Sequence, residues 1–189
     1  MAGKSEIILG IDPGTLVMGF GLIQIEGPRI LLLEMGVLKL SKFKEHQRRL
    51  QLIYNKVQEL TRLYSPSEVA IEAPFFGKNV QSMLKLGRAQ GVAIAAAMQH
   101  GLTAAEYSPR KIKQAVTGNG NASKEQVWKM VQQVLAFEGR PEYLDATDAL
   151  AVALCHYYEN RSFVTKSSSA KNKGWDEFLK QNAHRIKQP

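Results

Sequence analysis

The sequence predicts an α/β fold, in which three strands come first and further strands then alternate with helices. Two observations support this prediction. Short apolar runs separated by turn sequences fill the N-terminal part, and apolar positions at helical spacing alternate with short buried runs beyond it. With 189 residues and 44% apolar side chains, the chain is long enough for one domain with a core, followed by a modest extension.

Three consecutive antiparallel strands are expected over residues 6–12, 17–25 and 29–38. Each run is short and apolar, and the connecting sequences D-P-G-T and E-G-P are typical of turns. An amphipathic helix over residues 47–64 follows, because apolar side chains recur at helical spacing until Ser-Pro interrupts them. The next element is a buried strand over residues 68–72.

The helix expected over residues 79–100 is apolar on almost all sides. Leucine and alanine lie on the face opposite its main stripe, and its small residues allow close helix packing. We therefore expect one side to face the sheet and the other to face a second copy of the chain. The main stripe consists of Val80, Met83, Leu84, Gly87, Gly91, Ile94, Ala95 and Met98.

The rest of the domain is predicted to be mostly helical. Ser108-Pro109 is a typical helix start, with Ser as the N-cap and Pro in the first helical position. Ser123 and Gln126 form a capping box. The expected elements are a strand over 102–107, a helix over 109–116, a turn over 118–121, a helix over 123–137 and a helix over 145–160.

The positive charge of the chain is concentrated at its C-terminal end. The formal net charge is +8, of which residues 1–160 carry only +3, because residues 161–189 hold seven basic and two acidic side chains. We expect residues 1–160 to form one domain and residues 161–189 a flexible basic tail, which is rich in Ser, Lys and Asn. A basic chain suits nucleic acid, although many proteins of similar charge bind none. The tail either contacts DNA or a partner, or serves only as a disordered solubility tail.

The predicted location is the cytoplasm. Cys155 is the only cysteine, so an internal disulfide is excluded, and no Cys and His spacing resembles a zinc site. A strand pattern begins by residue 6, which leaves no room for a signal peptide, and no apolar run approaches the roughly 18 residues of a membrane span. We expect a soluble protein without membrane contact.

Four acidic residues stand where strands end or a helix begins. Asp12 follows IILGI and Glu72 follows VAI, while Asp145 and Asp148 open the last helix and share one of its faces. The carboxyl ends of parallel strands meet at one sheet edge, where a helix N-terminus can present further carboxylates. Carboxylates about 4 Å apart repel each other by roughly 4 kcal/mol at an effective dielectric of 20, so a cluster needs a proton or a cation. Oxygen ligands favour Mg²⁺ or Mn²⁺, and two such ions would serve phosphodiester hydrolysis.

Each of these residues also has a purely structural interpretation. Asp12 can be a turn residue of D-P-G-T, and Glu72 can be a solvent-exposed strand end. Asp145 can be the N-cap of the last helix, with Asp148 in its first turn.

Aromatic and basic residues accompany the carboxylates. Phe75 and Lys78 follow the second carboxylate in a loop, and stacking of an aromatic ring on an unpaired base contributes about 1–3 kcal/mol. Lys113 and Lys124 lie on or before helices after the last strand and can contact phosphate groups. Alternatively, Phe75 fills the core and the two lysines, like Arg110, are ordinary solvated surface residues.

Taken together, four motifs resemble the bacterial RuvC resolvases, and the match covers nearly all of residues 6–158. Several motifs in the same order are more specific than any single carboxylate. They are G-I-D-P-G-T at 10–15, A-I-E at 70–72 with Phe75 and K-N at 78–79, L-K-L-G-x-x-x-G-V-A-I at 84–94, and D-A-x-D-A-L-A-V-A at 145–153.

The resemblance implies a ribonuclease-H-like fold, with a mixed five-stranded sheet flanked by helices, and a homodimer formed through the helix at 79–100. It implies an endonuclease that resolves Holliday junctions by symmetric, Mg-dependent paired nicks in strands of like polarity, during homologous recombination and DNA repair. The implied partners are four-way junction DNA, the junction-binding RuvA and the motor RuvB.

The family pattern also implies roles for single residues. Phe75 matches the aromatic that stacks at the junction, and Lys78 lies in the same loop. Lys113 and Lys124 match basic residues that act in catalysis or DNA contact. The carboxylates that would catalyse the reaction and bind two Mg²⁺ ions per site, for which Mn²⁺ can substitute, are Asp12, Glu72, Asp145 and Asp148.

Three other functions remain open on the sequence alone. An actin-type nucleotide-hydrolysing or sugar-kinase domain also uses D-x-G-T, but it needs a second such motif and a second lobe. A non-catalytic module can recognise branched DNA, although the presence of all four acidic residues argues against lost chemistry. A nuclease of the same fold can act on other DNA or on RNA–DNA hybrids, although the Phe75 loop and the dimer helix favour junctions.

Overall fold

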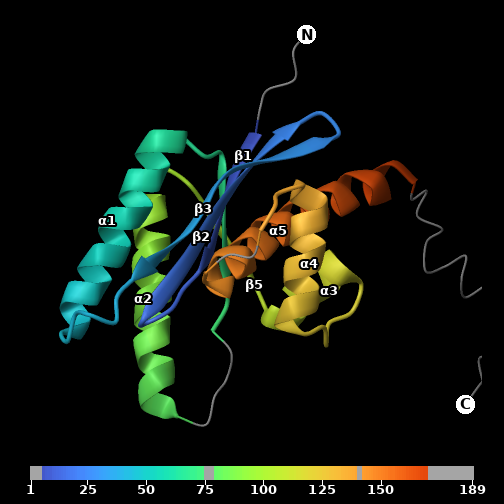
Figure 1. The fold of residues 1–189 in the computed structure, drawn as a ribbon. Helices are drawn as coiled ribbons and strands as arrows, with labels where there is room; N and C mark the ends of the chain where they lie inside the picture. Colours follow the sequence, from blue (N-terminus) through green and yellow to red (C-terminus); the bar gives the residue numbers. More distant parts are fainter. Residues whose placement is uncertain (1–5, 75–78, 140–141, 170–189) are drawn as a thin grey trace, which may run out of the picture. The chain divides into compact units, whose positions relative to one another are not determined.

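A computed structural model describes residues 6–74, 79–139 and 142–169, with side chains up to residue 161. The chain divides into two compact units, Met1–Tyr158 and Glu159–Pro189. No helix in this described part is long and apolar enough to cross a membrane. The elements, labelled in Figure 1, are β1 (Glu6–Asp12), β2 (Val17–Glu26), β3 (Arg29–Lys39), α1 (His46–Tyr64), β4 (Glu68–Glu72), α2 (Val80–Met98), β5 (Ala104–Tyr107), α3 (Pro109–Thr117), α4 (Lys124–Leu135) and α5 (Leu144–Ser169).

The strands form one mixed sheet in the order β3-β2-β1-β4-β5. The predicted antiparallel trio is confirmed, because β2 pairs with β1 on one side and with β3 on the other in antiparallel registers. β4 lies parallel to β1, and β5 lies parallel to β4. As a result, β1, β4 and β5 all end at the same edge of the sheet.

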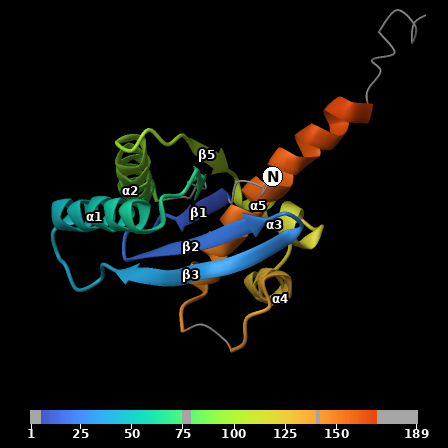
Figure 2. The same cartoon turned by 90° about the horizontal axis from the view of Figure 1, so that it is seen from above.

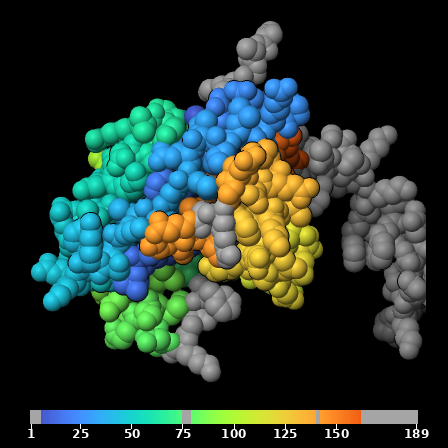
Figure 3. Space-filling view, viewed as in Figure 1, coloured from blue at the N-terminus to red at the C-terminus, as the bar shows by residue number. Residues whose placement is uncertain are grey.

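Helices cover both faces of the sheet, as the view from above shows (Figure 2). Successive strand side chains point to opposite faces, so Ile8 joins the core under α3, α4 and α5, whereas Leu9 and Ile11 join the core under α1 and α2. The space-filling view shows α4 packed beside the outer strand β3 (Figure 3). The sheet is therefore the layer between two hydrophobic cores.

α5 is the central helix of one of these cores. Its residues from Ala149 to Tyr157 are buried all round. The predicted end of this helix near Asn160 is wrong, because the helix continues to Ser169. Neither Gly nor Pro interrupts residues 144–169, and Lys is a good helix former, so the shift towards Ser and Lys does not end the helix.

The predicted starts of α3 and α4 are confirmed by their caps. Ser108 Oγ accepts a hydrogen bond from the backbone N–H of Lys111 at the start of α3. At the start of α4, Ser123 and Gln126 each accept a hydrogen bond from the backbone N–H of the other, which completes the capping box. Asn79 caps α2 in the same manner.

α2 has one buried side and one exposed side. Ala89, Ala93, Ala96 and Ala97 are fully buried in the core that α2 shares with α1 and the sheet. The described residues therefore cover only one of the two apolar sides that the sequence predicts. The stripe that they leave exposed, named here the α2 stripe, consists of Val80, Leu84, Gly87, Gly91 and Met98.

Candidate active site

Two of the predicted carboxylates end neighbouring parallel strands. Asp12 is the last residue of β1, and Glu72 is the last residue of β4. The parallel register pairs Ile11 with Ile71, so each acidic residue follows directly after a paired residue. The two carboxylates therefore leave the sheet at the same edge.

Glycines in β1 and β2 allow α5 to approach the sheet and bring the other two carboxylates to this edge. A Cβ on Gly10 would lie 2.1 Å from the carbonyl oxygen of Ala149, and a Cβ on Gly19 would lie 1.9 Å from that of Asp145. Such distances leave room for glycine alone, which permits close backbone approach. The first turn of α5, with Asp145 and Asp148, is thereby held against the end of β1.

Asp12, Asp145 and Asp148 form a compact group, named here the carboxylate cluster. One oxygen from each residue lies within 4.8 Å of those from the other two. Glu72 is not a member of this cluster, but it lines the same cavity as Asp12 and Asp148. The fold thus brings together all four predicted acidic residues, which are far apart in the sequence.

Burial and mutual repulsion oppose full ionisation of these carboxylates. Burial raises the pKa of Asp12 well above its usual value, and the charges of Glu72 and Asp148 raise it further. Burial, followed by the charge of Asp148, raises the pKa of Glu72 to about 7. The pKa of Asp148 is also raised, chiefly by burial. A bound cation would stabilise the ionised forms of all these groups, so their environment fits a metal site.

Two predicted lysines lie at the same site. Lys124 Nζ is 2.7 Å from Asp148 Oδ2. Burial lowers the pKa of Lys124, but the hydrogen bond and the charge of Asp148 outweigh this effect and raise the pKa above its usual value. Lys113 lines the cavity, and its charge partly offsets the rise in the pKa of Glu72 and Asp148. Both lysines therefore face the carboxylates and are not merely solvated surface groups.

A cavity of about 640 Å³ opens beside these groups. Its far wall comes from α3, from α4 and from the loop between them, and includes Arg110, Gly120 and Asn121. From the sequence, Arg110 was interpreted as a surface residue and the loop as a simple turn. Closeness to Lys124 in the sequence was the only signal that could have placed them at the site.

A second cavity, of about 780 Å³, is lined by residues of α1 and by Gln99 just after α2. It contains none of the predicted site residues.

The profile of one protein family, described as "Crossover junction endodeoxyribonuclease RuvC", matches residues 8–156. This range includes almost all of both cores and every acidic residue of the site. The chain belongs to the RuvC family. The resemblance seen in its motifs is thereby confirmed, and the actin-type alternative is wrong.

Other RuvC proteins are similar to this chain over nearly its whole length. Crossover junction endodeoxyribonuclease RuvC of Christiangramia forsetii is 55% identical, over 97% of this chain and 95% of its own. The RuvC protein of Porphyromonas gingivalis is 48% identical, over 99% of this chain and 100% of its own. Thermus thermophilus RuvC in complex with Holliday junction substrate is 34% identical and superimposes with a TM-score of 0.78, over 83% of this chain and 96% of that one. These relatives confirm the ribonuclease-H-like fold and the endodeoxyribonuclease assignment.

Two predicted site residues of this RuvC protein, Phe75 and Lys78, lie outside the described residues. The alternative that Asp145 is an N-cap is wrong, because α5 begins at Leu144 and Asp145 lies within its first turn.

Proposed function

We propose that this RuvC chain resolves Holliday junctions by symmetric paired nicks in two strands of like polarity, during homologous recombination and DNA repair. The observation that carries the proposal is the carboxylate cluster, partly buried at the end of β1 and beside Lys124. The junction complex of the Thermus thermophilus relative, which has the same fold, supports the choice of substrate.

The catalytic residues in this proposal are the cluster and Glu72, which together hold two Mg²⁺ ions per site, with Mn²⁺ as a possible substitute. The donors fit these ions, because carboxylate oxygens are the ligands that Mg²⁺ and Mn²⁺ prefer. The raised pKa values of Asp12 and Glu72 support the same conclusion, since these groups need a cation to be fully ionised near neutral pH. When bound, the ions supply the charge that activates a water and stabilises the leaving 3′ oxygen.

The basic residues of the chain act on the DNA. Lys124 holds Asp148 by its ion pair, and its ammonium group, together with that of Lys113, attracts the phosphate chain into the cavity. Phe75 stacks on an unpaired base at the junction, and Lys78 contacts the backbone beside it.

A homodimer formed through α2 supplies the second active site. The α2 stripe is exposed and apolar, and an added Cβ on Gly87 or Gly91 would meet no atom within 4 Å. This side of the helix is therefore open to a second helix. A twofold dimer fits a nearly twofold junction, so two strands of like polarity are cut. We place this nuclease in the cytoplasm with RuvA and RuvB as partners. We also assign residues 1–160 to the nuclease domain and the basic tail at 161–189 to DNA or partner contact.

The test is nicking of a synthetic mobile four-way junction, in parallel with linear duplex and RNA–DNA hybrid, in Mg²⁺. We expect paired symmetric nicks from the native chain and none from Asp12→Asn or Glu72→Gln, with junction binding retained in both. Glu125→Gln, on the exposed side of α4, is the matched control and should nick normally. Binding without nicking in Mg²⁺ or Mn²⁺ would indicate a recognition module instead. Preferential cutting of duplex or hybrid would overturn the substrate but not the fold.

A further inference from the structure

The wall of the active-site cavity holds a cation to which the proposed function gives no role. Arg110 is exposed, lies in the first turn of α3 and lines the cavity. Among the described residues, no ion pair or hydrogen bond engages its guanidinium group. Lys124, in contrast, is already paired with Asp148. Arg110 is therefore available to a negatively charged ligand that enters the cavity.

The position of Arg110 relative to the carboxylates indicates which part of the ligand it meets. Arg110 and Lys113 are three residues apart on α3, so they lie on the same face of the helix, one turn apart. Lys113 influences the pKa of both Glu72 and Asp148, and Arg110 is not among the groups that do so. Arg110 thus lies one helical turn before Lys113, which is the cation of this pair that acts on the two carboxylates. A DNA strand that presents one phosphate to the carboxylates would bring a neighbouring phosphate to Arg110.

The loop between α3 and α4 packs against the Arg110 side chain. A Cβ on Gly120 would lie 2.8 Å from Arg110 Cγ and 3.2 Å from the Arg110 carbonyl oxygen, so only glycine leaves room for this packing. One side chain, Gln114, bridges two positions of this loop. The Gln114 amide donates to the Gly118 carbonyl at 2.8 Å, and its oxygen accepts from the Gly120 N–H at 3.0 Å.

We propose that Arg110, positioned by Gly120, binds the phosphate next to the one that is cut and so sets the register of the DNA strand in the active site. A guanidinium group suits this role, because its planar fork of donors matches a phosphate with two parallel hydrogen bonds. The proposal rests on the proposed function, because it takes DNA as the substrate and the carboxylates as the place where the strand is cut.

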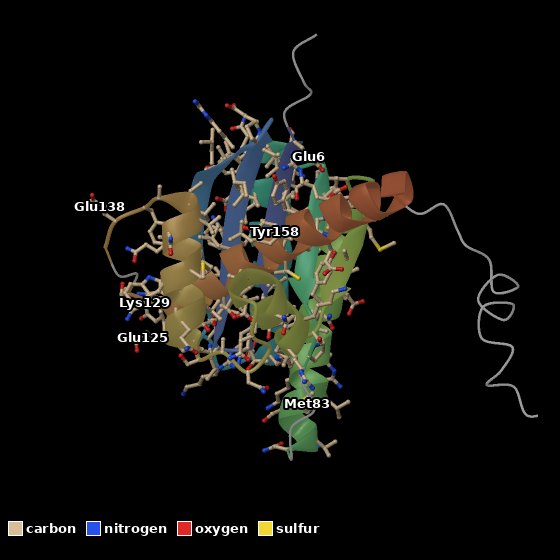
Figure 4. All side chains as sticks on the ribbon, turned by 90° about the vertical axis from the view of Figure 1, so that its right-hand side faces the viewer. Glu6, Met83, Glu125, Lys129, Glu138 and Tyr158 are labelled. Atoms are coloured by element: carbon tan, nitrogen blue, oxygen red, sulfur yellow. The ribbon has the colours of Figure 1, made fainter. Side chains whose placement is uncertain are left out.

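The first experiment measures binding of four-way junction and of duplex over a range of salt concentrations, in an Asp12→Asn background that cannot nick. Arg110→Gln should weaken binding about tenfold and reduce the slope of log affinity against log salt by about one, the loss of one phosphate contact. Arg110→Lys should recover part of the affinity, because it keeps the charge but not the fork. Lys129→Gln is the matched control and should change neither value, since Lys129 lies beside Glu125 on the side of α4 turned away from the sheet (Figure 4).

The second experiment tests the positioning by Gly120. Gly120→Ala should weaken binding, whereas adding Gly120→Ala to Arg110→Gln should have no further effect, because Gly120 acts through Arg110. In the nicking-competent chain, Arg110→Gln should spread the nicks over neighbouring phosphodiester bonds. Thermal unfolding would verify that each variant is folded.

Either of two results would overturn the proposal. In the first, Arg110→Gln has the same affinity and the same salt slope as Lys129→Gln. In the second, the effects of Gly120→Ala and Arg110→Gln on binding are fully additive. If the native chain prefers duplex to junctions, the proposed function fails, but the contribution of Arg110 can still be measured on that duplex.

Discussion

The Glu72 carboxylate carries an electrostatic cost that a proton or a cation can relieve. Burial and the charge of Asp148 raise its pKa in the folded chain to about 7, from an ordinary value of 4.5. The folded state therefore binds this proton more tightly than the unfolded state does. Below pH 4.5 both states are protonated at Glu72 and the carboxylate costs nothing, and the cost grows as the pH rises to about 7 and then remains constant.

We expect Glu72→Gln to remove this cost in the absence of divalent cations. With a chelator in the buffer, the variant and the native chain should have similar free energies of unfolding near pH 4.5. The variant should then become the more stable of the two as the pH rises, by up to about 3 kcal/mol above pH 7. Denaturant unfolding at several pH values measures the difference. Added Mg²⁺ should reduce this difference in the free energy of unfolding. A difference that does not change with pH would contradict the raised pKa of Glu72.

Lys124 competes with a cation for Asp148, because its ammonium group already neutralises that carboxylate. We expect Lys124→Gln to bind Mg²⁺ a few-fold more tightly, since a nearby positive charge is lost, and yet to nick more slowly, since the phosphate chain loses an attractive group. Calorimetric titration with Mg²⁺ and single-turnover nicking measure the two effects. Lys129→Gln on the same helix changes the formal charge equally and should alter neither. Weaker Mg²⁺ binding in the Lys124 variant would count against this description.

At the scale of secondary structure, the site depends on how closely α5 approaches β1 and β2. We expect Gly19→Ala to displace the first turn of α5, because the added Cβ would lie 1.9 Å from the Asp145 carbonyl oxygen. Nicking should fall by more than tenfold even where the chain is still folded. Gly36→Ala on β3 is the control, because its Cβ would instead meet the Phe20 ring at 2.6 Å, away from the carboxylates. If the two variants lowered the melting temperature by the same amount and also lost the same activity, both substitutions would act through stability alone.

The sequence predicts the elements well where a local signal marks them. Ser108 and Ser123 start two helices, and short apolar runs bounded by turn sequences assign β1 to β3 without reference to the rest of the chain. The end of α5 has no such signal, because Gly and Pro are absent from residues 144–169. The burial of α5 on all sides from Ala149 to Tyr157 was also not predicted, because it depends on the sheet and on the helices that pack around this segment.

The sequence predicts the acidic residues of the candidate site but not the contacts between its side chains. The four carboxylates could be selected because the order of the motifs and the family resemblance identify them together. The ion pair of Lys124 with Asp148 joins residues 24 positions apart, and the contact of Gly120 with Arg110 depends on how the loop between α3 and α4 folds back. Contacts of this kind arise from tertiary packing and leave no periodicity in the sequence.

At the scale of the whole molecule, the proposed dimer depends on the α2 stripe. We expect Leu84→Glu to produce a folded monomer, because it places a charge on a residue that is 52% exposed in the subunit but would be buried in the dimer. Sedimentation equilibrium measures the mass. The variant should also cut one strand of each junction at a time, so that single nicks replace the paired nicks. Leu63→Glu, at a 66% exposed leucine of α1 outside the stripe, should remain dimeric. A dimer that survives Leu84→Glu would place the interface elsewhere.

The place of α5 in the chain has a consequence during translation. The sheet face that carries Ile8 and Ile23 needs α5 as its cover, yet the ribosome makes α5 after every strand and after the other helices. A nascent chain therefore keeps an open apolar face until α5 emerges, and a chain released early would be prone to aggregate. The same helix brings Asp145 and Asp148 to Asp12. An unfinished polypeptide therefore lacks two carboxylates of the proposed active site, which is completed only in the step that also closes the core.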